Sequence, residues 1–417
     1  MLATGAAGAR VVGMLTVPFI TRIYLPEHMG VLSIFAALAA LIMPFGTLRY
    51  TMAIPLPKHD GVAANLAVLC ACSLLVVTLL VTLFLWIFAP TFLQMLSMEK
   101  LLPFWWLLPL AIGGSGLYEI LSNWAIREKA FRPLARTRVW QSFIGSITKI
   151  VLGLLGLKPL GLLIGQVSTQ VGGILSLFMS FQGKFKTTWR HVTRKRIGFV
   201  AGRYADFPKY RLPFQFLLIA STRAPLLFFA WQFGADTTGQ LGLALTMIAL
   251  PMTLFGQSTG QAYYAEIARI GSRKPVEIYI ITKNITKKLL MVSIPSFLVL
   301  LIFGPWLFEI VFGDVWREAG VFASILAVYL LAQFIYSPIG NGVFNVLRRQ
   351  STILLINLNR IFLIGCTFFF AYIKSFSPYV TLFTYSIVLT VQYIVVIFIV
   401  FNTIKKSIKG QINVNYN

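Results

Sequence analysis

Acidic residues, histidines and cysteines are all scarce in this sequence. The 417 residues include only 12 Asp and Glu, three His and three Cys. No H-E-x-x-H, G-x-S-x-G or P-loop pattern occurs, and the carboxylates are too scattered to suggest a catalytic pair. Cys70, Cys72 and Cys366 fall inside apolar runs, so they suggest neither a disulfide framework nor a zinc site. We therefore expect no enzyme activity, no metal site and no cofactor.

Charged residues as a whole are also rare. They make up 12% of the chain, whereas hydrophobic residues make up 58% and the mean hydropathy is +0.80. Soluble domains carry about 25% charged residues, roughly twice the share found here. A water-soluble fold of this size could not bury so much apolar surface, so we expect the chain to lie in lipid. A helix that crosses a membrane needs ~20 mostly apolar residues. No A-x-A type cleavage site follows the first apolar stretch, so we expect the first helix to remain in the mature protein.

The pattern of apolar runs and breakers predicts an all-α polytopic membrane protein with about 12 transmembrane helices. We expect them at residues 3–24, 29–48, 62–89, 102–126, 138–157, 159–182, 213–233, 238–258, 288–311, 318–345, 351–373 and 378–402. The long polar connection then separates two six-helix lobes around a central cavity, with residues 1–182 as the N-terminal lobe, 183–212 as a basic cytoplasmic linker and 213–417 as the C-terminal lobe with a short cytoplasmic tail. Weak similarity between residues 17–44 and 224–251 is typical of transporters built from repeats.

The basic residues predict the orientation. The net charge is +24 and the chain holds 36 Lys and Arg. Of these, 27 lie in the loops on one side, helix borders included, and five lie on the other side. Because Lys and Arg gather in cytoplasmic loops, we expect both termini in the cytoplasm. The same asymmetry explains the positive charge better than a nucleic-acid partner, which we do not expect.

Four basic residues lie well inside the predicted helices, namely Arg10, Lys149, Arg223 and Arg360. A charged side chain at mid-membrane costs roughly 2.5–3.5 kcal/mol, so it normally faces the bundle interior or a wet cavity. Glu119 is the one carboxylate at comparable depth, and one acid cannot neutralise four cations. An anionic ligand or lumen water would complete the set. The alternative is that the cations reach toward an interface or pair with Glu119 and backbone carbonyls.

Glu119 and the polar amides in the helices are further candidates. Glu119 could bind a driving proton or cation, or it could form a static ion pair with one of the cations. Amides can bond sugar hydroxyls, although most join helices, and only those that line a cavity would be functional. They are Asn123, Gln141, Gln166, Gln170, Gln215, Gln257, Gln261, Gln333, Asn341, Asn345 and Asn357.

Several stretches resemble the Wzx-type oligosaccharide flippases of the polysaccharide biosynthesis family. They are LRYTMAIPLPKHDGVAANL at 48–66, NWAIREKAFRPLARTRVWQS at 123–142, GLLIGQVSTQVGG at 161–173, RYADFPKYRLP at 203–213 and ALPMTLFGQSTGQAYYAEIA at 249–268. The resemblance covers nearly the whole chain. It implies the two-lobed, all-helical fold shared with multidrug and toxic compound extrusion transporters. Family members have more residues ahead of Met1, so the first helix is expected to be short at its cytoplasmic end.

The resemblance also implies a location and a substrate. The protein would lie in the bacterial inner membrane and pass undecaprenyl-pyrophosphate, carrying an O-antigen or capsule repeat unit, from the cytoplasmic to the periplasmic leaflet. A polysaccharide polymerase and a chain-length regulator are implied as partners beside the membrane lipid. We expect Lys149, Arg223 and Arg360, together with Arg10, to line the central cavity and hold the pyrophosphate.

Three other functions are open. A cation-coupled efflux transporter of the same fold, for drugs or metabolites, would be expected to place acids rather than cations in its cavity. A membrane glycosyltransferase or polymerase that acts on lipid-linked sugars would need a large outer loop, whereas the longest one here, at about residues 90–101, is short. A purely structural subunit would leave the membrane cations unexplained.

Overall fold

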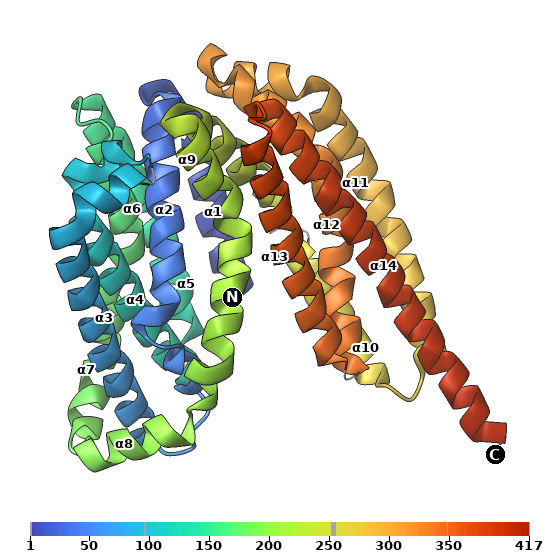
Figure 1. Ribbon diagram of the computed structural model, residues 1–417. Coiled ribbons are helices and arrows are strands. Elements are labelled where there is room, and N and C mark those ends of the chain that lie inside the picture. The colour runs from blue at the N-terminus through green and yellow to red at the C-terminus, as the bar shows by residue number, and fades with distance from the viewer. Residues whose placement is uncertain (1, 96, 252–255, 348, 417) are drawn as a thin grey trace. The chain divides into compact units, whose positions relative to one another are not determined.

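The long apolar stretches all form helices in the computed structural model, which describes residues 2–95, 97–251, 256–347 and 349–416. No strand occurs in these ranges. The predicted all-α fold is therefore confirmed. The chain divides into two compact units, Met1–Gly242 (unit 1) and Leu243–Asn417 (unit 2), shown in Figure 1 by the colours up to yellow-green and from there to red. The lobe boundaries expected at residues 182 and 213 remain predictions.

Unit 1 contains eight helices, three short helical turns and most of a ninth helix. They are α1 (Leu2–Ile23), α2 (Pro26–Gly46), η1 (Tyr50–Ala53), α3 (Asp60–Met95), η2 (Glu99–Phe104), α4 (Leu107–Arg127), α5 (Phe131–Leu154), α6 (Leu160–Val171), α7 (Ile174–Trp189), α8 (Arg194–Arg203), η3 (Phe207–Arg211) and α9 (Leu212–Pro251). The side chains of Phe35, Ile112, Leu163 and Ala230 join α2, α4, α6 and α9 in one buried core. A second buried core around Trp124 joins the first half of α3, the end of α4 and the middle of α7.

Unit 2 continues from the end of α9 through five helices. They are α10 (Gln257–Ile270), α11 (Pro275–Phe312), the turn η5 (Asp314–Trp316), α12 (Arg317–Val346), α13 (Gln350–Ile373) and α14 (Pro378–Tyr416). Helix α12 is the central element, because it packs on α10, α11, α13 and α14. The buried side chains of Tyr263, Ile339, Phe344 and Val400 form the core between α10, α12 and α14.

Among the described residues, eight helical segments are long and apolar enough to cross a membrane. They are Pro26–Gly46, Asp60–Met95, Leu160–Trp189, Phe207–Ala249, Pro275–Phe312, Asp314–Val346, Ser351–Ile373 and Pro378–Lys409. The segment Phe207–Ala249 covers two predicted spans, because Gly234 has a φ of 81° and bends α9 between them. The three remaining predicted spans correspond to α1, α4 and α5, which carry more polar residues. The total of 12 spans stays a prediction.

Several predicted boundaries differ from the observed ones. The α-helix that corresponds to the predicted span 102–126 begins at Leu107. The predicted span 159–182 is divided into two helices, α6 and α7, by Gly172 and Gly173. The predicted loops 183–212 and 259–287 are largely helical, since they contain α8, α10 and the first turns of α11. Backbone hydrogen bonding does not stop where an apolar run stops, so a helix continues until residues such as Gly271, with a φ of 72°, end it.

Candidate functional site

Lys149 lies on α5 where that helix crosses α6 closely. A Cβ atom added to Gly165 of α6 would come within 2.3 Å of Lys149 Cγ and 2.9 Å of the Gly145 carbonyl oxygen. The half-buried Lys149 ammonium group donates a hydrogen bond to Gln166 Oε1 at 3.0 Å. The Tyr24 hydroxyl donates to the Lys149 carbonyl at 2.7 Å. Because Gln166 is a neutral acceptor, it positions the charge of Lys149 without neutralising it.

Arg10 lies on α1, which packs along α5. The Ser142 hydroxyl donates to the Ala9 carbonyl at 2.7 Å, and Tyr24, just after α1, contacts the carbonyl of Lys149. These two contacts show that α1 and α5 run in the same direction. Ser142 and Lys149 are separated by two helical turns, so Arg10 and Lys149 lie at levels about 10 Å apart along one helix pair. The Arg10 side chain is half-buried.

Arg223 lies in the part of α9 that belongs to unit 1. This part of α9 packs beside α2, where the rings of Phe216 and Phe45 have centroids 5.4 Å apart. The Arg223 side chain is half-buried, and it has no hydrogen-bond or ion-pair partner among the residues that the structure describes. Arg223 belongs to unit 1, together with Arg10 and Lys149. The lobe boundary predicted at residue 213 would instead group it with Arg360 in the C-terminal lobe.

Arg360 lies on α13 in unit 2 among tyrosines of α12 and α14. Its guanidinium group donates to the Tyr393 hydroxyl at 3.5 Å, and its charge acts on Tyr329, Tyr336 and Tyr385. The ring centroids of Tyr329 and Tyr385 are 5.6 Å apart, as are those of Tyr336 and Tyr393. These four phenols form the tyrosine cluster, and one of them, Tyr393, contacts the cation.

The tyrosine cluster is not among the site residues predicted from the sequence, although its spacing is visible there. Tyr329 and Tyr336 are seven residues apart on α12, and Tyr385 and Tyr393 are eight residues apart on α14. Both spacings correspond to two helical turns, so each pair lies on one face of its helix. Single tyrosines in apolar helices are common, and only the packing of α12 against α14 brings the pairs together.

A pocket of about 290 Å³ lies between α10 and α12 in unit 2. Its lining residues are small, hydroxylated or amidic: Gly256, Gly260, Gln261, Tyr264, Ser337, Pro338, Gly342 and Asn345. Gln261 and Asn345 are two of the amides noted in the sequence, whereas the side chains of Gln257 and Asn341 lie outside the described part. Because most of the lining side chains carry amide or hydroxyl groups, this pocket is suited to water or a polar ligand.

Glu119 on α4 forms an ion pair with Arg49, which the sequence analysis assigned to a loop. Arg49 Nη1 lies 3.1 Å from Glu119 Oε1, and the Thr51 hydroxyl donates to the same oxygen at 2.8 Å. The two charged side chains are only 15% and 16% exposed. Leu48 and Arg49 have positive φ angles of 47° and 60°, which fold the link after α2 back toward α4. The partner of Glu119 is therefore this link residue and none of the four membrane cations.

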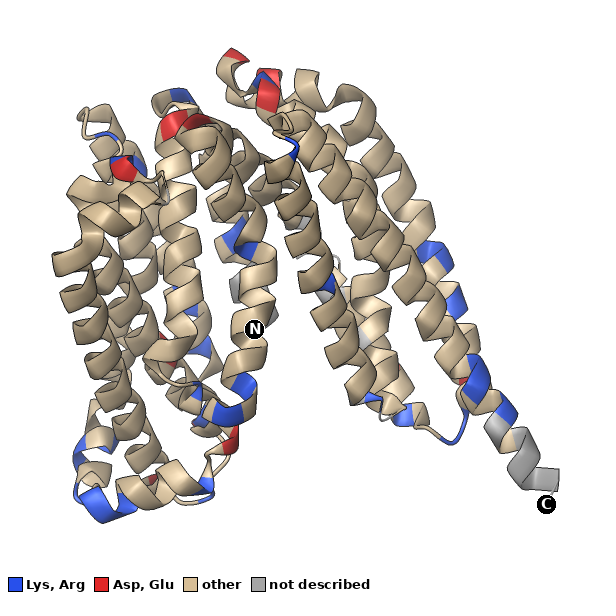
Figure 2. Cartoon of the chain, viewed as in Figure 1, with Lys and Arg blue, Asp and Glu red and all other residues tan. Residues whose placement is uncertain are grey.

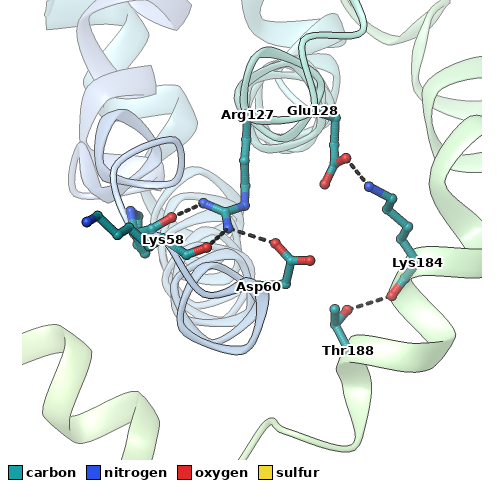
Figure 3. Close-up of polar contacts among 7 residues, drawn as sticks. Lys58, Asp60, Arg127, Glu128, Lys184 and Thr188 are labelled. Carbon is teal, nitrogen blue, oxygen red and sulfur yellow. Dashed lines mark hydrogen bonds and ion pairs between the residues drawn. The ribbon is translucent and has the colours of Figure 1, made fainter.

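A second polar cluster ties the stretch 48–66 to the stretch 123–142. Arg127 donates to Asp60 Oδ1 at 2.7 Å and to the Lys58 carbonyl at 3.2 Å, while Glu128 forms an ion pair with Lys184 of α7 (Figure 3). The side chain of Arg127 is 9% exposed. These contacts join the ends of α3, α4 and α7. Two of the five stretches that carry the family resemblance thus lie side by side, and this cluster stabilises the fold of unit 1.

The charge balance decides what the helices with cations can bind. No Asp or Glu occurs in residues 1–26, 129–205, 207–235 or 319–417. These ranges include all of α1, α5, α6 and α13 and the part of α9 that carries Arg223, and Glu119 is already paired. Within the described ranges, no group of three His, Cys, Asp or Glu could hold a metal ion. The charged side chains of these stretches are therefore Arg and Lys.

Comparison with solved structures shows the fold. The chain is similar to the lipid II flippase MurJ in an inward closed conformation, with a TM-score of 0.69, 14% identity, and coverage of 99% of this chain and 90% of that one. It is also similar to an inward-facing multidrug resistance MATE family transporter of the MOP superfamily, with a TM-score of 0.56, 15% identity, and coverage of 98% and 95%. The eukaryotic MATE transporter AtDTX14 gives a TM-score of 0.52 at 15% identity, with coverage of 99% and 96%.

These similarities establish a polytopic membrane fold that flippases and MATE transporters share. None of the curated proteins matches the chain. The profile of the family described as "Polysaccharide biosynthesis protein" matches residues 19–321, which is most of the sequence. The family resemblance noted in the sequence is thereby confirmed, and the chain belongs to the polysaccharide biosynthesis protein family.

Proposed function

We propose that the protein is a flippase. Its substrate is undecaprenyl-pyrophosphate that carries an oligosaccharide repeat unit, which moves from the cytoplasmic to the periplasmic leaflet for O-antigen or capsule synthesis. The observation that carries the proposal is the excess of cations: Arg10, Lys149, Arg223 and Arg360 lie half-buried in helical stretches without carboxylates, and Glu119 is paired with Arg49. A pyrophosphate supplies the negative charge that the protein lacks.

The four cations suit a pyrophosphate for different reasons. Arg offers a planar fork for bidentate phosphate bonds, and Lys supplies a point charge. Lys149 is oriented by Gln166, and Arg360 donates to Tyr393. Both of these partners are neutral, so they hold the cations in place without adding negative charge. If the pyrophosphate binds to separate cations in turn, its binding to each one is weak enough to permit release.

The pocket between α10 and α12 suits the sugar. Its amides, Gln261 and Asn345, and its hydroxyl groups, on Ser337 and Tyr264, can donate to and accept from sugar hydroxyls. The pocket and Arg360 both lie in unit 2, where Tyr336 of the tyrosine cluster precedes Ser337 directly. One molecule that carries both a pyrophosphate and a sugar would use both features.

The proposed cycle needs two lobes and an energy source. We place the lobes at residues 1–182 and 213–417, joined by a cytoplasmic linker, with a central cavity that the four cations line. Movement of the lobes would hand the pyrophosphate from one group of cations to another while the lipid tail remains in the bilayer. Glu119 is the proposed site for a driving proton or cation. A polysaccharide polymerase and a chain-length regulator would be partners in the inner membrane.

The proposal is tested by lipid analysis and by transport. In a strain that lacks the gene, we expect lipid-linked repeat units to accumulate in the cytoplasmic leaflet, and the gene should restore surface polysaccharide. Purified protein in vesicles should move a fluorescent undecaprenyl-pyrophosphate oligosaccharide to the opposite leaflet. Gradient-driven export of drugs without movement of the lipid-linked sugar would instead indicate an efflux transporter. Chain extension of the sugar by the purified protein would indicate a polymerase.

A further inference from the structure

The segment between α7 and α9 contains a short helix, α8, that lies across the ends of the long helices of unit 1. Figure 1 shows α8 at the lower end of unit 1, lying across the end of α3. Helix α8 packs against α3 through Val200, which is 2% exposed. The Tyr50 hydroxyl donates to the Ala201 carbonyl at 3.0 Å and holds the middle of α8 in place. Since α3 is long and apolar enough to cross a membrane, we expect a helix that lies across its end to run along the membrane surface.

The surface of this segment is strongly basic. Nine exposed cations occur between residues 184 and 211, with Asp206 as the only acid (Figure 2): Lys184, Lys186, Arg190, Arg194, Lys195, Arg196, Arg203, Lys209 and Arg211. Lys184 has the carboxylate of Glu128 as its partner. The others carry their charge at the surface.

The segment also carries three exposed aromatic side chains, which are typical of the headgroup layer of a membrane. Trp189 ends α7 and is 66% exposed, Phe199 on α8 is 61% exposed, and Tyr210 before α9 is 61% exposed. Trp and Tyr at the ends of membrane spans prefer the headgroup layer. Arg203 lies 5.9 Å from the Phe199 ring centroid, and Lys209 lies 5.1 Å from that of Tyr210. Aromatic rings beside cations are typical of helices that lie in the membrane interface.

We propose that residues 184–211 form a docking surface, the α8 surface, for the anionic head groups of the adjacent leaflet. The exposed aromatics would enter the boundary between head groups and acyl chains, and the cations would bind lipid phosphates. Charge alone could reflect a cytoplasmic loop in water. Exposed aromatics at both ends of the segment and in its middle favour contact with lipid as well. The inference concerns bulk lipid and does not depend on which substrate the protein carries.

The test uses the full-length protein in nanodiscs and a polarity-sensitive dye on α8. The three native cysteines are replaced by Ser, and Gly198→Cys carries the dye, because a Cβ at Gly198 meets no atom within 4 Å. In phosphatidylcholine nanodiscs with a rising share of phosphatidylglycerol, we expect a blue shift of the dye emission. High salt should reverse the shift, since contacts between exposed charges are screened.

Two variants separate the charges from the aromatic ring. Arg194→Gln, Lys195→Gln and Arg203→Gln together should raise the phosphatidylglycerol share needed for half the shift by roughly threefold or more. Arg196 is left intact, because its guanidinium group donates to the His191 carbonyl. Phe199→Ser should reduce the size of the shift while the salt dependence remains. The control variant removes three exposed lysines of α11, Lys283, Lys287 and Lys288, and should behave as the parent protein.

The outcomes are distinct. A shift that ignores phosphatidylglycerol, or that the α8 and α11 charge variants weaken equally, would overturn the α8 surface. A shift that inorganic pyrophosphate abolishes at constant ionic strength would assign these cations to soluble phosphate ligands and overturn it as well. Equal melting temperatures of all variants in the nanodiscs confirm that each remains folded.

Discussion

At the scale of single residues, Arg360 is the membrane cation that donates a hydrogen bond to the tyrosine cluster. Arg360→Ala should lower transport by roughly 30-fold or more, because charge-assisted hydrogen bonds to phosphate contribute about 2 kcal/mol. Arg360→Lys should be milder, since the charge survives although the fork is lost. Surface polysaccharide and vesicle transport provide the measurements, with protein accumulation checked by immunoblot. Lys374→Ala, an exposed position just after α13, is the control, and equal effects of both changes would refute a role in binding.

Glu119 allows a structural role and a coupling role to be separated. Glu119→Gln leaves Arg49 without its charged partner and should lower the melting temperature, because an unpaired half-buried charge is costly. Arg49→Gln combined with Glu119→Gln should recover most of that stability. If Glu119 couples transport to a gradient, the double variant stays inactive in energised vesicles. Recovery of both stability and gradient-driven transport in the double variant would show that the pair is only structural.

At the scale of the helices, the close crossing of α5 and α6 positions Lys149. Gly165→Ala places a methyl group within 2.9 Å of the Gly145 carbonyl oxygen and closer still to the Lys149 stem. The helices must then separate, at a cost of about 1–3 kcal/mol. We expect a lower melting temperature and a loss of transport. Gly183→Ala on α7 is the matched control, because a Cβ there meets no atom within 4 Å, and helical Ala is favoured over Gly.

Helix continuity is where the sequence was least informative. The expected loop 259–287 contains α10 and the start of α11, and the expected linker contains α8. Lys, Arg and Glu are good helix formers, so a polar stretch can extend a helix beyond the membrane. The apolar runs mark the hydrocarbon region, whereas glycines such as Gly234 and Gly271 mark where the helices bend or end.

For the molecule as a whole, the distribution of basic residues predicts the topology. Reporter fusions after Lys184 and Lys409 should read cytoplasmic, and a fusion after Lys100 should read periplasmic. Alkaline phosphatase and green fluorescent protein report the two sides in opposite ways, so each fusion point is checked twice. Phosphatase activity at Lys184 would reverse the orientation, and it would also place the α8 surface on the other leaflet.

The sequence by itself determined the membrane class, the all-α fold, the family and the four cations in apolar helices. It could do so because hydropathy, charge and motif order are properties of the chain alone. The tertiary structure decided the partners: Arg49 for Glu119, Gln166 for Lys149 and the tyrosine cluster for Arg360. These pairs are separated by 70, 17 and at most 33 residues along the chain. Only helix packing brings such residues together, since hydrogen bonds and ion pairs depend on distances of about 3 Å that no local pattern encodes.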